Sequence, residues 1–411
     1  MNRRNALLLL LLLPYCLLAQ PNTQSPYSYF GLGEFDLSAY GKNSGMAGVA
    51  YGLRSAGFVN HLNPASYAGF DSLRVVLDVS ASGKLSRLST LDNSHTGFNG
   101  NIKRIALGLR LHRMVAVSLG ITPYTNVGYT VHSSEPVVGL PNDYAVATYS
   151  GDGGLSRVYL GTSFRPIKNL SVGVNVSMIF GYINRSKSTS HSLVNATWTE
   201  KFRYKPNSSY LFDFGAQYTI KLHNKTYLTL GAITGLNSKV NMTKYFSITT
   251  GLEGNEEKRD VETFHLPLRI GGGISLTTAR WTIAADYETQ RWSSMISKNR
   301  TTRFQNTHRA AVGVGFCPNY YLGRNILQRM TYQAGLHYER LPLLLHSQRQ
   351  NAYGITLGLD MPFRQNLSTV AFSVDFGTQG RASHTLIREN YIKFNLGISF
   401  SDFWFLKPQY D

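Results

Sequence analysis

The chain has 411 residues, of which 43% are hydrophobic, 12% aromatic and only 16% charged. This composition excludes a disordered chain, which would be rich in charge and poor in aromatic residues. Lys and Arg outnumber Asp and Glu by 41 to 23, so the first partners to consider are nucleic acid and anionic lipid.

Residues 1–20 have the pattern of a secretory signal peptide: a cationic start, a leucine-rich run and a small-residue cleavage site near Ala19. The apolar run is shorter than the ~20 residues that a membrane-spanning helix needs, and Pro14 interrupts it. We therefore expect export followed by cleavage. The mature chain would then hold one cysteine, Cys317, and no intramolecular disulfide.

Residues 21–71 are rich in glycine and do not alternate between apolar and polar positions. They carry enough large apolar side chains to pack, for example Phe58 and Leu62. We expect this segment to be a plug, or hatch, inside a barrel formed by residues 72–411. The alternative is a periplasmic tail.

From residue 72 onward, apolar and polar residues alternate with a period of two, which predicts strands. In the segment 170–180, for example, Val172, Val174 and Val176 alternate with Gly173 and Asn175. About fourteen such segments occur, near residues 72–84, 98–111, 114–130, 153–165, 169–184, 208–221, 226–240, 262–277, 280–291, 308–317, 329–340, 351–362, 368–379 and 391–402.

Tight turns alternate with longer polar connections, which we expect at residues 131–152, 185–207, 241–261 and 292–307. This asymmetry is typical of an all-β, antiparallel, up-and-down transmembrane β-barrel with short periplasmic turns. A soluble sandwich or propeller is the alternative. Aromatic residues at the ends of the apolar stripes would form the membrane girdles, at Trp281, Tyr287, Trp292, Tyr353 and Trp404.

The inward positions of such a barrel carry charges of both signs, at Arg74, Asp78, Arg104, Arg110, Asp213, Arg269, Asp286, Glu288, Arg309, Asp360, Asp375 and Lys393. Arg or Lys facing lipid would cost about 2–4 kcal/mol near the bilayer midplane, so a place in the lumen is expected. Their structural role would be to bond the hatch and one another. As a binding site, Arg269 or Arg309 would hold the carboxylate of an amphipathic ligand.

The other basic residues mark turns and loops, among them Lys84, Arg185 and Lys201. Nucleic-acid binding would need these residues on one accessible face, so it is not expected. Outer-membrane lipids and lipopolysaccharide are the expected partners of cations at the membrane edges.

Several short motifs resemble the FadL-like outer-membrane transporter family. Ser55-Ala56-Gly57 followed by Asn63-Pro64-Ala65 is similar to the family's hatch motif. The segment 264–271, which contains His265, Pro267 and Arg269, resembles its Leu-Pro strand, and the segment 332–338 resembles a later strand. The start at 25–33 and the end at 404–407 resemble an uncharacterised Bacteroidota branch. The resemblance implies a fourteen-stranded outer-membrane barrel that is plugged by an N-terminal hatch.

The resemblance suggests passive uptake of a hydrophobic or amphipathic, fatty-acid-like molecule, with hatch movement opening the path. The alternative is a protein-interaction or secretion-associated barrel that transports nothing. The candidate ligand-contacting residues are His265, Pro267, Arg269 and Arg309, and Pro267 also marks a strand that could kink or open laterally. The histidines lie singly and no nucleophile motif, phosphate loop or metal spacing occurs, so we expect no enzyme, cofactor or metal.

Overall fold

The structure is a computed structural model, and it describes residues 25–36, 40–136, 144–191, 196–249, 257–292, 303–319, 325–345, 348–363, 368–383 and 386–404. The strands are β1 (Glu34–Phe35), β2 (Arg74–Ser89), β3 (Ser94–His112), β4 (Val115–Pro136), β5 (Tyr144–Ile167), β6 (Leu170–His191), β7 (Ala196–Pro206), β8 (Tyr210–His223), β9 (Thr226–Gly235), β10 (Ser238–Thr249), β11 (Glu257–Leu266), β12 (Arg269–Thr277), β13 (Trp281–Gln290), β14 (Arg303–Phe304), β15 (Thr307–Phe316), β16 (Thr331–Leu345), β17 (Gln348–Phe363), β18 (Ser368–Gly380) and β19 (Arg388–Phe403). The short helical segments are η2 (Pro26–Tyr29), η3 (Gly41–Met46), η4 (Pro64–Gly69) and α2 (Ile326–Arg329).

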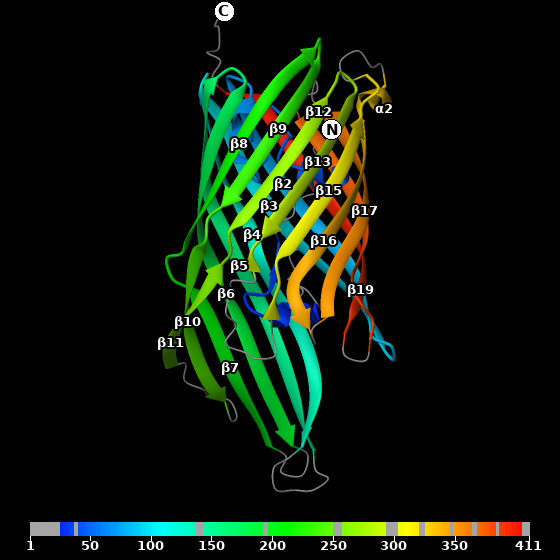
Figure 1. Cartoon of the computed structure of the whole chain (residues 1–411). Helices are drawn as coiled ribbons and strands as arrows, with labels where there is room; N and C mark the ends of the chain where they lie inside the picture. Colours follow the sequence, from blue (N-terminus) through cyan, green and yellow to red (C-terminus); the bar gives the residue numbers. More distant parts are fainter. Residues whose placement is uncertain are drawn as a thin grey trace, which may run out of the picture.

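These segments form one antiparallel barrel, which closes where β19 pairs with β2 (Figure 1). Four wall strands are each interrupted once, so that each is recorded as two segments: β7/β8, β9/β10, β11/β12 and β14/β15. Strand β1 lies in the lumen and is not part of the wall. The wall therefore has 14 strands, and the predicted fold is confirmed.

The alternation in the sequence corresponds to the two faces of the wall. On β6, Ser171, Asn175 and Ser177 are buried in the lumen, whereas Val172 and Val176 are about 40% exposed on the outer face. An apolar outer face and a polar inner face are what a lipid-embedded barrel requires. Among the described residues, no helix is long and apolar enough to cross a membrane.

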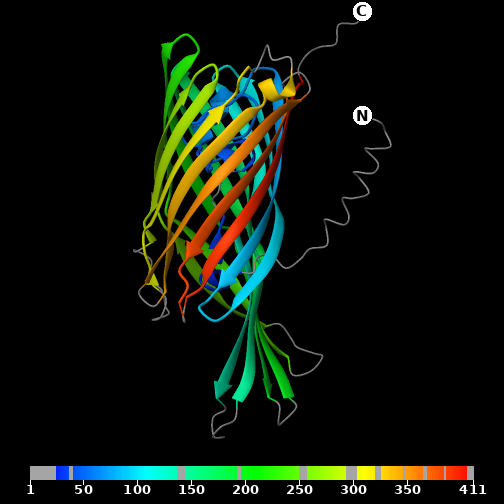
Figure 2. The same ribbon diagram turned by 90° about the vertical axis from the view of Figure 1, so that its right-hand side faces the viewer.

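The tight turns lie at the end of the barrel where hairpins such as β3–β4 and β5–β6 close, and we assign this end to the periplasm. The expected loops at 131–152, 185–207 and 241–261 are largely strand instead. Strands β4 to β7 run well past the rest of the barrel at the opposite, external end, as Figures 1 and 2 show.

The part of the predicted hatch that the structure describes fills the barrel at two levels. Residues 40–70, which we call the hatch core, contain η3 and η4 and contact β5, β6, β8, β17 and β18 near the periplasmic end. Residues 25–36, which we call the strap, contact β4 nearer the external end through η2 and β1. The predicted signal peptide lies outside the described residues.

Candidate functional site

The hatch core contacts the wall through glycines that face the lumen. On β16, a Cβ added at Gly335 would lie 2.6 Å from the backbone of Met46 and Ala47, a distance that real Cβ atoms do not reach. On β17, a Cβ added at Gly358 would lie 2.6 Å from Gly45 Cα. The same close approach to the hatch core recurs around the barrel, at Gly108, Gly161, Gly173, Gly215, Gly231, Gly271, Gly313 and Gly397. This ring of glycines lets the hatch backbone pack directly on the strands.

Buried polar side chains of the wall also bond the hatch backbone. The Asp286 carboxylate on β13 accepts from the amides of Ala50 and Tyr51 at 2.6 and 3.0 Å. Arg104 on β3 donates to Val59 O at 2.9 Å and forms a 2.7 Å ion pair with Asp78 on β2. Both charged side chains are almost completely buried, so the ion pair is shielded from water.

Asn63, in the predicted hatch motif, caps the short helix η4 and also anchors a distant part of the hatch core. Its Oδ1 accepts from the Ala65 amide at 3.1 Å, and its Nδ2 donates to Tyr51 O at 2.7 Å. Pro64 is the first helical residue, a position that needs no amide hydrogen. Asn63 is fully buried, so the motif is part of the packed hatch core.

Two neighbouring wall strands are not paired with each other along part of their length, between residues 94–104 of β3 and residues 122–136 of β4. We call this gap in the ladder the first seam, and the strap lies beside it. These strands pair only from Ile105 and Ile121 to the periplasmic turn, and then diverge. Within the seam, β1 pairs with β4, with Glu34 opposite Asn126 and Phe35 opposite Thr125. The strap therefore takes the place that β3 leaves beside β4.

An ion pair connects the strap to the other side of this first seam. Lys103 on β3 lies 2.7 Å from the Asp36 carboxylate, and the Asp36 amide donates to Tyr124 O on β4 at 3.0 Å. Burial alone would raise the pKa of Asp36, but the ammonium groups of Lys103 and Lys393 hold that pKa below its ordinary value. Asp36 thus stays ionised and joins the two edges.

A second seam lies where β11 ends. Strand β11 pairs with β10 on one edge, and in the described part of the chain its other edge has no ladder partner. The wall strand is interrupted at Pro267 and Leu268, between β11 and β12. The last backbone hydrogen bond toward β13 runs from the Arg291 amide, just after that strand, to Leu268 O. The wall strand is therefore irregular at Pro267, and a lateral opening there stays a prediction.

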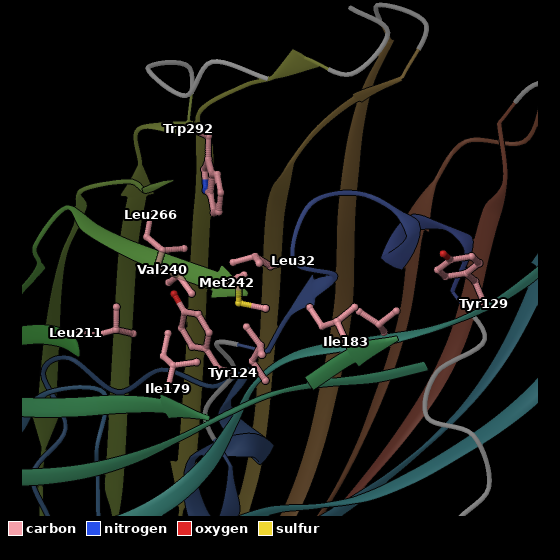
Figure 3. Close-up of a cluster of buried hydrophobic side chains, with 12 residues drawn as sticks. Leu32, Tyr124, Tyr129, Ile179, Ile183, Leu211, Val240, Met242, Leu266 and Trp292 are labelled. Atoms are coloured by element: carbon pink, nitrogen blue, oxygen red, sulfur yellow. The ribbon is translucent and has the colours of Figure 1, made fainter. Parts of the chain in front are cut away.

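The inner faces of β4, β5, β6, β8, β10 and β11, together with Leu32 of the strap and Trp292 after β13, form an apolar arc. Figure 3 shows its side chains gathered around Leu32 of the strap, with Trp292 above Leu266. The ring centroids of Phe35, in the strap, and Trp292 are 5.0 Å apart. The arc consists of Leu32, Tyr124, Val127, Tyr129, Leu155, Ile179, Ile183, Leu211, Val240, Met242, Leu266 and Trp292. Trp292 is only 4% exposed, so its expected place in the outer girdle was wrong.

A chamber of about 1360 Å³ adjoins this arc on the external side of the hatch core. Its opposite side is a polar arc on β2, β3 and β16 to β19, which includes Lys84, Lys393, Asp375 and Gln350. Leu32, Tyr129, Leu266 and Trp292 of the apolar arc line the chamber, and charged residues such as Lys239 line it beside them. A pocket with both apolar and polar lining, larger than the ~300–1000 Å³ typical of small-molecule sites, is suited to an amphipathic molecule.

The chamber is lined by cations that the sequence had placed in loops, among them Lys84 and Arg185. Lys84 lies on β2, where its ammonium is 2.6 Å from the Glu389 carboxylate. Arg185 lies on β6 and donates to Gly31 O of the strap. Both interpretations were wrong because the strands continue past the predicted ends.

The predicted ligand-contacting residues are not brought together in one site. His265, Pro267 and Arg309 line the chamber, and Arg309 donates to Ala47 O of the hatch core at 2.8 Å. Arg269 does not line it, because it lies 3.0 Å from Asp213 in a buried ion pair. Gln350 and the strap residues were missed, and no local pattern in the sequence marks them as lining a cavity.

No group of three or more His, Cys, Asp or Glu side chains in the described ranges is arranged to hold a metal ion. A sequence search of curated proteins finds no significant match.

Several solved barrels share the fold. The CymD monoaromatic hydrocarbon channel is 14% identical, covers 90% of this chain and 99% of its own, and has a TM-score of 0.55. The Pseudomonas putida toluene transporter TodX is 15% identical over 90% and 100% of the two chains, with a TM-score of 0.58. A Pseudomonas aeruginosa FadL homologue is 14% identical over 90% and 98%, also with a TM-score of 0.58.

These structures confirm the predicted FadL-like architecture, and membership in a Bacteroidota branch stays a prediction. The family profile described as BamG matches residues 1–411. Because this match spans the whole sequence, the chain belongs to the BamG family.

Proposed function

We propose that this protein is an outer-membrane barrel that admits a hydrophobic or amphipathic small molecule from outside into its chamber. The chamber carries the proposal, because part of the apolar arc lines it at the level where two seams interrupt the wall. A ligand held there has its apolar part against Leu266 and Trp292, close to the edge of β11 that has no ladder partner in the described part of the chain.

The movement that opens the path is assigned to the strap, with the hatch core staying in place. Wall side chains bond the hatch core on many strands, and the glycine ring packs against it. Moving the hatch core would leave the buried Asp286 carboxylate without its two amide donors and would remove the Val59 amide from Asp78. The strap is bonded mainly to β4 and crosses to Trp292, so its displacement would free both seams. Lateral exit beside Pro267 would deliver the ligand to lipid.

The structural neighbours support this proposal, since TodX is a toluene transporter and CymD is a monoaromatic hydrocarbon channel. More specifically, we propose that the ligand resembles a fatty acid. Outer-membrane lipids and lipopolysaccharide remain the proposed surroundings.

The test is native mass spectrometry of the barrel in nanodiscs with a twelve-carbon amphiphile as the probe. We expect a one-to-one adduct, and Trp292→Ala should weaken binding about tenfold, or ~1.4 kcal/mol. Trp281→Ala is the matched control, because Trp281 is 47% exposed on the outer face of β13. Absence of any adduct, or equal effects of the two substitutions, would contradict the proposal.

A second candidate function is an outer-membrane protein-interaction or secretion-associated barrel. The observation that favours it is the one-sided extension of β4 to β7 (Figure 2), which carries exposed apolar side chains such as Tyr144, Val146 and Trp198. Such a surface is typical of contact with another protein. A stoichiometric protein partner in the purified complex, lost on Tyr144→Ser with Val146→Ser, would favour this function over uptake.

A further inference from the structure

Two arginines of the wall meet at the periplasmic mouth of the barrel. Arg110 lies near the end of β3 and faces the lumen, where its Nη1 donates to Phe70 O of the hatch core at 3.2 Å. Its Nη2 donates to Arg113 O in the β3–β4 turn. Arg165, near the end of β5, donates from its Nη2 to the same oxygen at 3.0 Å. Two guanidinium groups therefore share one carbonyl acceptor.

A third arginine, Arg54, approaches them from the hatch core. Its Nη2 donates to Ser171 Oγ on β6 at 2.8 Å, and its Nη1 donates to Thr219 Oγ1 on β8 at 3.4 Å. Its Nε is buried and has no hydrogen-bond partner in the described part of the chain. Burial and the charges of Arg165 and Arg110 lower the pKa of Arg54 to about 10, so the three groups lie close enough to repel one another. We call these three residues the arginine cluster.

No carboxylate of the described residues forms an ion pair with the arginine cluster, whose acceptors are neutral carbonyl and hydroxyl oxygens. Asp71 lies near Arg110, but its carboxylate is paired with Arg74 at 2.8 Å. The segments around the three adjoining turns, 108–119, 160–174 and 216–230, contain no Asp or Glu, whereas their basic residues are Arg110, Arg113, Arg165, Lys168, Lys221 and Lys225. Converging like charges are unfavourable, so this side of the mouth attracts anions.

We propose that the arginine cluster is a binding site for a phosphate group at the periplasmic mouth. Guanidinium groups bind phosphate oxygens through paired N–H bonds. A phosphate monoester carries about two negative charges and three acceptor oxygens, which suits three converging arginines better than a single carboxylate does. A soluble phosphate and the head group of an inner-leaflet lipid that reaches the rim offer this same chemistry.

The site is separate from the ligand chamber, since none of the three arginines lines that chamber. The inference is therefore independent of the proposed uptake. Arg54 belongs to the hatch core, whereas Arg110 and Arg165 belong to β3 and β5. A bound phosphate would thus join the plug to two wall strands at the end of the barrel that the plug closes.

The first experiment is isothermal titration calorimetry of the detergent-solubilised barrel with inorganic phosphate, at an ionic strength held constant with chloride. We expect one saturable site, and Arg165→Gln should weaken it at least tenfold. Lys168→Gln is the matched control, because it removes one positive charge from the exposed β5–β6 turn close by in the sequence. This control should change the affinity less than about twofold, as expected for a screened surface charge.

The second experiment tests the lipid source by native mass spectrometry of the barrel from phosphatidylcholine nanodiscs that contain phosphatidic acid. If the site takes lipid phosphate, one phosphatidic acid adduct is expected, lost in Arg165→Gln and kept in Lys168→Gln. Absence of a signal in both experiments, or equal losses in the two variants, would overturn the proposal. Binding of a glutamate-rich peptide where neither phosphate probe binds would also overturn it and would make this mouth a protein-docking surface.

Thermal unfolding separates phosphate binding from a structural role of Arg165. Without phosphate, Arg165→Gln relieves repulsion within the arginine cluster, so its unfolding midpoint should equal or exceed that of the unmodified protein. Phosphate should raise the midpoint of the unmodified protein and leave that of the variant unchanged. A lower midpoint of the phosphate-free variant would show that Arg165 stabilises the fold through Arg113 O, and would contradict the proposal.

Discussion

The two halves of the barrel differ in how the wall and its contents are joined. At the hatch core, the strands pair around the full circumference, and buried groups such as Asp286 bond the plug directly. At the chamber, the same strands divide into two sheets at two seams, and the strap bridges them with few bonds. Regions with few buried contacts open at lower free energy than packed cores. We therefore expect the hatch core to keep the periplasmic half of the barrel closed, and the strap in the external half to move.

The largest effect should come from the buried ion pair of the hatch level. Asp78→Asn leaves Arg104 without its carboxylate, and loss of one partner of a buried pair costs about 3–5 kcal/mol. The exposed pair Arg74 and Asp71 is the matched control, and Asp71→Asn should cost ~0–1 kcal/mol. Thermal unfolding in detergent would measure both. Equal shifts of the unfolding midpoint would remove the contrast between the halves.

The glycine ring should be the next most sensitive feature. Gly335→Ala places a Cβ 2.6 Å from the hatch backbone, and overpacking of this kind costs about 1–3 kcal/mol. Gly272→Ala on β12 is the control, because its Cβ would have its nearest neighbour at 3.7 Å. Heat-modifiability on gels would compare the two variants. A barrel that tolerates both substitutions equally would show that the hatch core is loosely held.

A smaller loss is expected at the hatch motif. Asn63→Ala removes the cap of η4 and the bond to Tyr51 O, and should cost about 1–2 kcal/mol. Asn63→Ser retains a capping oxygen, so it should recover part of that loss. Thermal midpoints of the two variants test this, and identical values would mean that the cap contributes nothing.

The smallest effect on stability is expected from a disulfide that joins β1 of the strap to β4 of the wall. Glu34 and Asn126 are direct partners of β1 and β4, so cysteines at both positions can form a disulfide without moving the backbone. The oxidised form should retain or raise the thermal midpoint and slow ligand exchange at least tenfold. The reduced form of the same protein is the control. Exchange that is independent of the redox state would assign the movement to another segment.

The sequence predicted the strands best where both faces of the wall have distinct surroundings. On β6, lipid outside and lumen inside impose the alternation of Val172 and Val176 with Asn175. The segments 131–136 and 185–191 consist mostly of polar residue types and show no such alternation. For that reason residues 131–136 and 185–191 were predicted to be loops although they continue β4 and β6.

The chamber could be predicted only in part, because its geometry depends on contacts between residues far apart in sequence. Arg269 was correctly expected to face inward, yet its partner Asp213 lies on another strand and removes it from the ligand site. Trp292 has the same residue type as the girdle residue Trp281, yet it is buried inside the barrel against Phe35 and Phe304. The strap was expected to be part of the hatch, but nothing local predicts its pairing with β4.

The ring of glycines has a consequence for the order of folding. Glycine-rich strands are weak on their own, so the strands that carry Gly335 and Gly358 depend on the plug for their order. A plug that fits into these recesses cannot be threaded into a finished cylinder. A chain without residues 21–71 is therefore expected to give no heat-modifiable species on gels. At the closure of the barrel, where β19 pairs with β2, Gly397 packs against Gly41 of the hatch core, so the barrel closes around a plug already in place.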